Sequence, residues 1–306
     1  MSFEIKILGS TSAIPVLNRH HSAQLIIIEQ NVFLVDCGES TQHQLFKYKV
    51  KINRIDAIFI SHLHGDHYLG LVGLISTMHL QGRNRELQIF GPPGLDDIIV
   101  LQLKLSETFL NYKLTFTSLE TDKNIVIFDS PKFTVSTIPL SHRISCSGFL
   151  FKEKPKKRRL IKEKLPAEIS LADMAKLKSG EDIVEDNGQV KYENIHYTLP
   201  PKKIRSYAYC SDTRYDEDIL SIIHRVDLLY HEATFLSDLQ ERARLTYHST
   251  AKEAALIALK AEVGKLIIGH FSSRYKDLAP LLEESKAYFT STYLAIEGAT
   301  FEIADE

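Results

Sequence analysis

The chain has 306 residues, 44% of them hydrophobic and 25% charged, and its formal net charge is −2. These values are typical of a soluble globular protein, and neither an apolar run of ~20 residues nor a signal-peptide pattern is present. The three cysteines are isolated, which argues against a zinc ribbon or a redox pair and favours a reducing, cytoplasmic compartment.

Strands and helices alternate in both halves of the chain. Apolar runs predict strands at 3–8, 24–29, 32–35, 55–60, 87–90, 114–118, 125–128, 133–139, 207–210, 226–230, 265–268, 292–295 and 300–303. Helical spacing and capping patterns predict helices at 40–48, 68–80, 95–105, 250–261 and 278–288. This mixture indicates a single α/β domain, residues 1–306, with helices outside packed sheets.

Four metal-capable side chains lie within six residues, directly after a predicted buried strand. They are His62, His64, Asp66 and His67. In extended backbone the first two point the same way because side chains alternate, and Gly65 allows the turn that brings the other two to the same space. Imidazole and carboxylate suit zinc or a similar divalent ion. One tetrahedral zinc with an open position needs fewer ligands from one segment, so we predict two metals and further ligands elsewhere.

Three more candidate ligands follow predicted strands: His142, Asp212 and His270. Each alone is equally typical of a hydrogen-bonded loop residue, but strand ends also position side chains for a site. Asp212 is the candidate bridge, because a carboxylate can hold two ions about 3.5–4 Å apart. His248 lies just before a capping box and is not needed as a ligand, so it is a candidate general acid. Glu232 is a candidate to orient His248.

Residues 152–200 interrupt this alternation and are predicted to form an excursion from the globule. The stretch 151–165 has eight lysines and arginines but only two glutamates, and the remainder has few apolar residues. A solvated charged surface would give the same pattern. Because the net charge of the whole chain is small, any nucleic-acid-binding surface must be local.

The combined motifs point to a known family. His62-x-His64-x-Asp66-His67, followed by His142, Asp212 and His270, resembles the metallo-β-lactamase superfamily. Further segments are similar to the ribonuclease Z family of tRNA 3′-processing endonucleases, and the resemblance extends over about residues 5–277. These segments are Asp36-Cys-Gly-Glu-Ser-Thr-Gln42, Phe90-Gly-Pro-Pro-Gly94, His231-Glu-Ala-Thr234, His248-Ser-Thr250 and Gly269-His-Phe-Ser-Ser-Arg-Tyr275.

The resemblance implies an αββα four-layer sandwich with two Zn²⁺ per subunit at one edge. One zinc would take His62, His64 and His142, the other would take Asp66, His67 and His270, and Asp212 would bridge them. The basic segment 152–200 would be the flexible arm, an exosite that binds precursor tRNA, and the protein would be a homodimer. One departure is that residues 151–200 lack the Gly-Pro-rich tip usual in bacterial arms.

The predicted function is a zinc-dependent endoribonuclease that removes the 3′ trailer from precursor tRNA. It would leave a 3′-hydroxyl on the tRNA and a 5′-phosphate on the trailer, through attack by a metal-activated hydroxide. Asp66 would accept the water proton and His248 would protonate the leaving oxygen. The alternatives are a small-molecule phosphodiesterase or a lactonase or thioesterase on the same scaffold, which has no use for a basic arm, and an inactive nucleic-acid-binding protein, which needs no complete ligand set.

Overall fold

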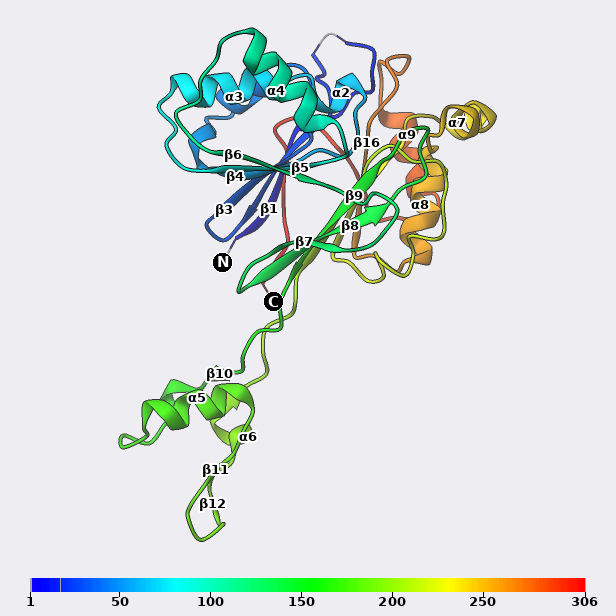
Figure 1. The fold of residues 1–306 in the computed structure, drawn as a ribbon. Coiled ribbons are helices and arrows are strands. Elements are labelled where there is room, and N and C mark those ends of the chain that lie inside the picture. Colours follow the sequence, from blue (N-terminus) through cyan, green and yellow to red (C-terminus); the bar gives the residue numbers. More distant parts are fainter. Residues whose placement is uncertain (1, 17, 306) are drawn as a thin grey trace.

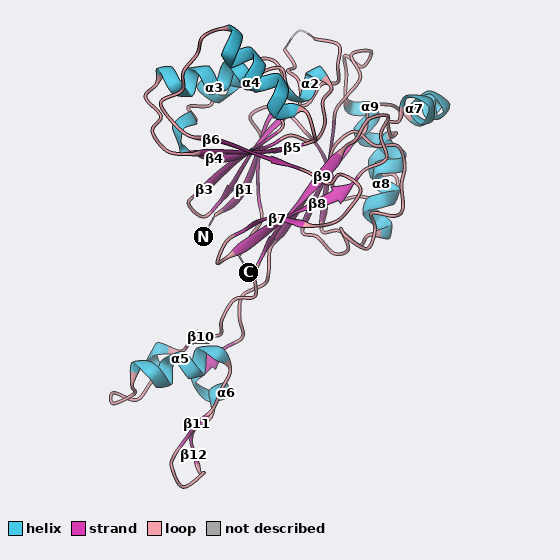
Figure 2. Cartoon of the chain, viewed as in Figure 1, coloured by secondary structure: helices cyan, strands magenta, loops and turns pink. Residues whose placement is uncertain are grey.

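Two large β-sheets pack face to face in the computed structural model, which describes residues 2–16 and 18–305 (Figure 1). Helices cover the outer face of each sheet, so the layer order is helix, sheet, sheet, helix (Figure 2). This arrangement confirms the predicted four-layer sandwich. No helix within these ranges has the length and apolar character needed to cross a lipid bilayer.

The first sheet has the strand order β18-β1-β2-β3-β4-β5-β6. Its strands are β1 (Phe3–Gly9), β2 (Ala23–Ile28), β3 (Asn31–Val35), β4 (Ile55–Phe59), β5 (Leu87–Gly91), β6 (Leu114–Ser118) and β18 (Thr300–Glu302). The helical segments on this side are α1 (Thr41–Lys47), η1 (Ile52–Arg54), α2 (Gly65–Tyr68), α3 (Leu71–Leu80) and α4 (Leu95–Leu105). Strands β3 to β6 are parallel, so the carboxyl ends of β3 and β4 lie at the same edge.

The second sheet has the strand order β17-β16-β15-β14-β9-β8-β7. Its strands are β7 (Val126–Asp129), β8 (Phe133–Pro139), β9 (Ser147–Glu153), β14 (Ser206–Cys210), β15 (Leu228–Glu232), β16 (Lys265–Gly269) and β17 (Thr292–Leu294). The helical segments on this side are η3 (Ser237–Leu239), α7 (Gln240–Thr246), α8 (Ala251–Lys260) and α9 (Ala279–Lys286). The capping box predicted at Thr250 and Glu253 is present at the start of α8.

The space between the sheets is filled by aromatic and aliphatic side chains. Phe33, Phe59, Phe149 and Phe151 are fully buried in one continuous apolar cluster. Burial of such a side chain contributes roughly 1.5–3 kcal/mol, and edge-to-face pairs such as Phe33 and Phe59 add to this. Phe59 ends β4, three residues before His62, so the first metal-capable segment starts from a rigid part of the core.

The predicted helix 68–80 is interrupted in the structure. Helix α2 stops at Tyr68 and α3 begins at Leu71. The interruption brings Gly70 against the loop after β3, where its amide donates to the Cys37 carbonyl at 2.9 Å. A Cβ on Gly70 would lie 2.2 Å from the Gly38 carbonyl oxygen, so only glycine fits this close approach.

Strand β9 and helix α7 were not predicted from the sequence. Strand β9 continues from an apolar run into the charged segment, and its last residue, Glu153, is buried because it pairs with Arg205. Helix α7 buries only Ala243 among its residues, so it has no apolar stripe to reveal it.

Residues between β9 and β14 form an arm that projects away from the sandwich on the side where the chain ends (Figure 1). Its elements are β10 (Arg159–Leu160), η2 (Lys162–Lys164), α5 (Leu171–Ser179), β11 (Ile183–Val184), β12 (Val190–Tyr192), α6 (Asn194–Tyr197) and β13 (Thr198–Leu199). The arm has a small apolar cluster of its own, centred on Ile169, Leu177 and Ile183.

Candidate metal centre and active site

The predicted site residues meet at one edge of the sandwich, where several strands end. Asp212 follows β14, Glu232 ends β15 and His270 follows β16. These three strands are parallel, so their carboxyl ends share an edge. The loop after β4 approaches from the other sheet, and the loop after β8 carries His142. Residues far apart in sequence therefore converge because of strand direction.

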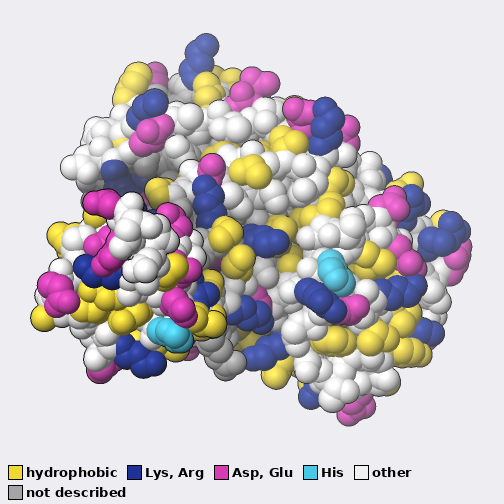
Figure 3. All heavy atoms as spheres, turned by 90° about the horizontal axis from the view of Figure 1, so that it is seen from below, with side chains coloured by type: hydrophobic (Ala, Val, Ile, Leu, Met, Phe, Trp, Pro, Cys, Tyr) yellow, Lys and Arg dark blue, Asp and Glu magenta, His cyan; other side chains and the backbone are white. Residues whose placement is uncertain are grey.

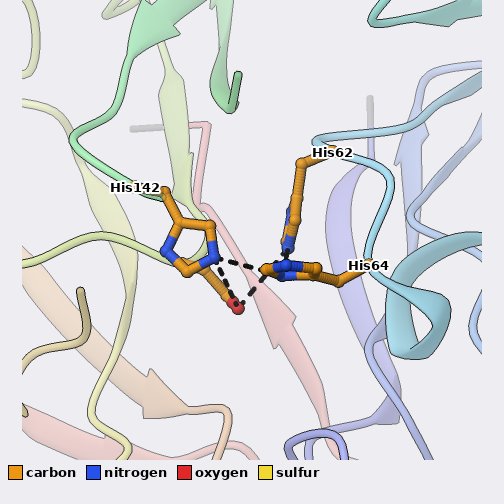
Figure 4. Close-up of side chains that lie close together, drawn as sticks. His62, His64 and His142 are labelled. Atoms are coloured by element: carbon orange, nitrogen blue, oxygen red, sulfur yellow. Dashed lines mark hydrogen bonds and ion pairs between the residues drawn. The ribbon is translucent and has the colours of Figure 1, made fainter. Parts of the chain in front are cut away.

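The first group consists of three histidines, His62, His64 and His142, which Figure 4 shows, and Asp212. Nδ1 of His64 lies 3.0 Å from Nε2 of His62 and 3.1 Å from Nε2 of His142. Asp212 Oδ2 lies 3.5 Å from Nε2 of His62 and 3.9 Å from Nε2 of His142. Three imidazole nitrogens and one carboxylate oxygen thus face a common centre.

The second group consists of Asp66, His67, His270 and the same Asp212. Asp212 Oδ1 lies 3.3 Å from Nε2 of His67 and 3.2 Å from Nε2 of His270. Asp66 Oδ2 lies 3.2 Å from Nε2 of His270. Asp212 therefore directs one oxygen to each group, the arrangement expected of a ligand shared by two ions.

The donor atoms of both groups fit divalent cations. The Nε2 atoms of His67 and His270 lie 3.4 Å apart, a contact that two lone pairs tolerate only with a proton or cation between them. Burial and neighbouring histidines lower the pKa of His64 to about 4, and burial lowers that of His142 to about 4, so both are neutral at pH 7 and have a lone pair to donate. Asp212 Oδ1 is buried and makes no hydrogen bond within the described part of the chain.

The charge balance of the site is a second reason to expect divalent cations there. Burial alone would lower the pKa of His67, but Asp212, Asp66 and Asp36 outweigh it and hold that pKa above its usual value. The buried carboxylates therefore require positive charge among them. Two divalent ions would supply that charge without a protonated histidine.

The outer ring nitrogens of these histidines are held in place by neighbouring groups. The pairs are His67 Nδ1 with Asp36 Oδ2 at 2.7 Å, His270 Nδ1 with Thr234 Oγ1 at 2.9 Å, His142 Nδ1 with the Tyr247 carbonyl at 2.9 Å, and His62 Nδ1 with Ser61 Oγ at 3.0 Å. Such partners fix the orientation and tautomer of a ligating ring. His64 differs, because the neighbour of its outer nitrogen is a cation and not an oxygen atom: Nε2 lies 2.9 Å from Nη2 of Arg143.

Asp36 is the main contributor that the sequence analysis did not assign to the site. It is fully buried, and it accepts hydrogen bonds from the Ser61 amide at 2.8 Å and the Tyr209 hydroxyl at 2.6 Å besides its contact with His67. The signal was present in the sequence, since Asp36 directly follows a buried strand, as does the segment that contains Asp212.

Replacement of Asp36 by asparagine is expected to weaken metal binding about 10- to 100-fold, because His67 loses the charged partner that orients its ring. The measurement is competition with a chromophoric chelator. Asp56→Asn is a matched control, since Asp56 lies in β4, outside both groups, and pairs with Arg85. Equal metal affinity of the Asp36 variant and the wild type would show that Asp36 does not support the site.

The structure also brings His248 and Glu232 together. Nδ1 of His248 lies 2.8 Å from Oε1 of Glu232. The other carboxylate oxygen, Oε2, accepts bonds from the Thr234 amide at 3.0 Å and the Thr234 hydroxyl at 2.7 Å. Glu232 is fully buried and held from several sides, so it fixes the ring of His248, which is stacked on His270.

The charge on His248 is set by this contact. Burial would lower the pKa of His248, but the Glu232 carboxylate outweighs burial and raises that pKa to about 9. The ring is therefore protonated at neutral pH in the absence of metal. Cations in the neighbouring groups would lower this pKa, because like charges oppose the protonated ring.

Five members of the two groups and His248 line a cleft of about 470 Å³; the five are His64, Asp66, His142, Asp212 and His270. Arg143, Arg242 and Arg274 also line it, so the cleft combines acid–base groups, metal-capable groups and cationic side chains. Arginine binds phosphate well because its planar fork donates two parallel hydrogen bonds. The arrangement is suited to hydrolysis of an anionic phosphate ester.

Comparison with known proteins gives consistent results. A family model described as anti-Pycsar protein Apyc1 matches residues 3–155, the half that contains His62 to His67 and His142 but not Asp212, Glu232, His248 or His270. The chain is 54% identical to ribonuclease Z of Cytophaga hutchinsonii, over 100% of this chain and 97% of that protein. It is 44% identical to ribonuclease Z of Bacteroides thetaiotaomicron, over 96% and 93%. The crystal structure of the short form of human tRNase Z superposes with a TM-score of 0.72 and 26% identity, covering 99% of both chains.

Proposed function

The chain belongs to the ribonuclease Z family, and we propose that the two metal-capable groups that share Asp212, together with His248, form the site that removes the 3′ trailer from precursor tRNA. It is an endoribonuclease of tRNA 3′ processing on a metallo-β-lactamase scaffold. The observation that carries this assignment is the 54% identity along the whole chain. The proposed products are a tRNA with a 3′-hydroxyl and a trailer with a 5′-phosphate.

The seven side chains of the two groups would hold two Zn²⁺, with Asp212 between them. Such ions lower the pKa of a water molecule toward neutrality and draw charge from the phosphate. Burial would raise the pKa of Asp66, but His67 and His270 outweigh it and keep that pKa well below its usual range. Asp66 is therefore ionised at neutral pH. It also lines the cleft, where it would accept the proton of the attacking water.

His248 would donate a proton to the 3′ oxygen as it leaves. It lines the same cleft, the Glu232 carboxylate favours its protonated form by raising its pKa, and its Nε2 is not engaged by Glu232. Glu232 lies behind the ring and does not face the substrate, so we assign it a positioning role. A general acid of this kind contributes typically 10²- to 10⁴-fold to a rate.

The assignment is tested by incubating a precursor tRNA that has a 3′ trailer with the metal-loaded protein, with and without chelator, and mapping both ends of each product. We expect one metal-dependent cut. A parallel assay offers a small phosphodiester, a lactone and a thioester. Hydrolysis of one of these without cleavage of the precursor tRNA would support the small-molecule alternative instead.

The arm is proposed to bind the tRNA away from the cleft. Lys157, Lys162 and Lys164 are exposed and, among the described residues, form no ion pair. Exposed lysines of this kind bind phosphates and release counterions, which makes binding dependent on salt.

Replacement of Lys162 and Lys164 by glutamine is expected to weaken precursor-tRNA binding and to reduce the slope of log K against log salt by about 1 to 2. Fluorescence anisotropy at several salt concentrations measures this slope. The control pair is Lys47→Gln and Lys286→Gln, two exposed lysines on the sandwich. Slopes that match for both variants and the wild type would remove the arm from tRNA binding.

A homodimer is proposed from the exposed apolar surface around α3 and α4. Leu80, Leu105 and Phe109 are 81%, 75% and 84% exposed, unusual values for large apolar side chains. The Asn111 amide donates to Nδ1 of His79 at 3.1 Å, which holds the loop of Phe109 beside the end of α3. We expect Leu105→Asp to shift the mass seen by light scattering from dimer toward monomer. A wild-type protein that is monomeric at micromolar concentration would contradict the proposal.

The proposed compartment is the cytoplasm. Cys37, Cys146 and Cys210 are all free and buried, as is common where thiols stay reduced. Cell fractionation followed by detection of the protein provides the measurement, and recovery in the membrane or an extracytoplasmic fraction would contradict this placement.

A further inference from the structure

The position of the arm depends on how two connecting segments are held. The arm is joined to the sandwich by residues 154–158 and 200–205, which contain no helix or strand. The apolar cluster of the arm is separate from the three clusters of the sandwich. Since no shared core fixes the arm, polar contacts at its root must set its direction.

A buried ion pair forms the first of these contacts. Arg205 donates to both carboxylate oxygens of Glu153, from Nε at 3.1 Å and from Nη2 at 2.7 Å. Nη1 of Arg205 donates to the Ile303 carbonyl at 3.1 Å. The last residue of the outgoing strand, the returning segment and the chain near residue 303 are thus joined at one point.

Asp305 makes the second contact, one step further toward the arm. Lys156 of the outgoing segment donates to its Oδ1 at 2.9 Å, and Lys202 of the returning segment donates to its Oδ2 at 2.6 Å. The Asp305 side chain is only 15% exposed. The two lysines hold the pKa of Asp305 well below its usual range, so it is ionised at neutral pH. One carboxylate therefore connects both segments.

Two further lysines of the root, Lys154 and Lys203, are paired with acidic residues as well, whereas Lys157 is exposed and forms no ion pair among the described residues. Lys154 pairs with Asp129, and Lys203 pairs with Asp227. Lysine and arginine side chains gather in the middle of the face that Figure 3 shows. At the root of the arm, Lys156, Lys202 and Asp305 line a cavity of about 720 Å³. Because these cations are already neutralised within the chain, they are poor candidates for binding RNA phosphates.

We propose that Asp305 is a positioning residue for precursor tRNA: by joining Lys156 to Lys202 it holds the arm in the direction in which arm and cleft engage one substrate. This inference rests on the proposed role of the arm. It assigns different tasks to two sets of lysines. The paired lysines of the root fix the arm, and the unpaired Lys157, Lys162 and Lys164 remain for the RNA.

Kinetics of Asp305→Asn test the proposal against simple electrostatics. The substitution removes one negative charge and the link between two lysines, although Lys156 keeps its pair with Glu153 and Lys202 keeps its bond to the Asp305 carbonyl. Electrostatics alone therefore predicts tighter binding of RNA. We instead expect KM for precursor tRNA to rise about three- to tenfold, the range that two partly exposed ion pairs supply, with kcat and hydrolysis of a small phosphodiester unchanged. Asp305→Glu should restore KM. Glu302→Gln makes the same charge change in β18 without touching the root and should match the wild type.

The direction of the arm is measured separately, so that a failure of this proposal differs from a failure of the proposed function. Spin labels on introduced cysteines at Asn187 in the arm and Asp218 in the sandwich give a distance distribution; both positions are exposed, and the native cysteines are buried. We expect a narrow distribution in the wild type and in Asp305→Glu, and a broad one in Asp305→Asn. An unchanged distribution, or tighter binding of precursor tRNA by Asp305→Asn, would overturn the proposal.

Discussion

Replacement of His248 by alanine is expected to reduce turnover of precursor tRNA about 10²- to 10⁴-fold while metal content stays that of the wild type. His248 lies beside the metal-capable groups but contributes no atom to either four-residue group that contains Asp212. Its ring faces the cleft and its proton is retained through Glu232. The loss should therefore fall on kcat, since the step affected is protonation of the leaving oxygen.

Glu232→Gln tests the contribution of the Glu232 charge separately from that of the His248 ring. The amide preserves the size of the side chain and a hydrogen bond to His248, but it removes the charge that raises the pKa of the ring. We expect kcat to fall less than in His248→Ala, and the alkaline limb of the kcat profile to move to lower pH, because a ring with a lower pKa loses its proton earlier as pH rises. Turnover of His248→Ala equal to that of the wild type would remove His248 from the mechanism.

The fold was predictable because its signals are local. Short β-branched runs bounded by polar residues identified β1 to β6, and the capping box at Thr250 identified the start of α8. The metal-capable residues were predictable for a related reason, since each follows a strand end and the parallel strands β14, β15 and β16 bring such ends together. The family resemblance then supplied the αββα layers, which the structure confirms.

The contacts that support the site could not be read from the sequence in the same way. Asp36 follows a strand end, as the candidate ligands do, but its contact with His67 spans 31 positions, and the contact of Asp305 with Lys156 spans 149. No local pattern predicts either contact. Sequence identified Glu232 as a candidate to orient His248, but their 2.8 Å contact depends on the end of β15 meeting the turn after α7. The charge of the arm was visible, whereas its division into paired and unpaired lysines required the fold.

Replacement of Asp212 by asparagine is expected to lower the metal content from about two ions per chain to about one. Each group keeps three of its four donors, and three ligands suffice for one zinc. Two divalent cations at adjacent positions repel each other, however, and Asp212 is the negative charge shared between them. Without that charge, occupancy of one position opposes occupancy of the other.

Loss of the second ion should reduce turnover by about 10³-fold or more, because the attacking and the leaving oxygen are then no longer stabilised together. Metal analysis after dialysis and kcat on precursor tRNA are the measurements. Asp218→Asn is the matched control, an exposed aspartate six positions further along the chain whose replacement should change neither quantity. If the Asp212 variant retained two ions and wild-type turnover, Asp212 would not bridge the groups. Its two oxygens would then only hold the neighbouring histidines in position.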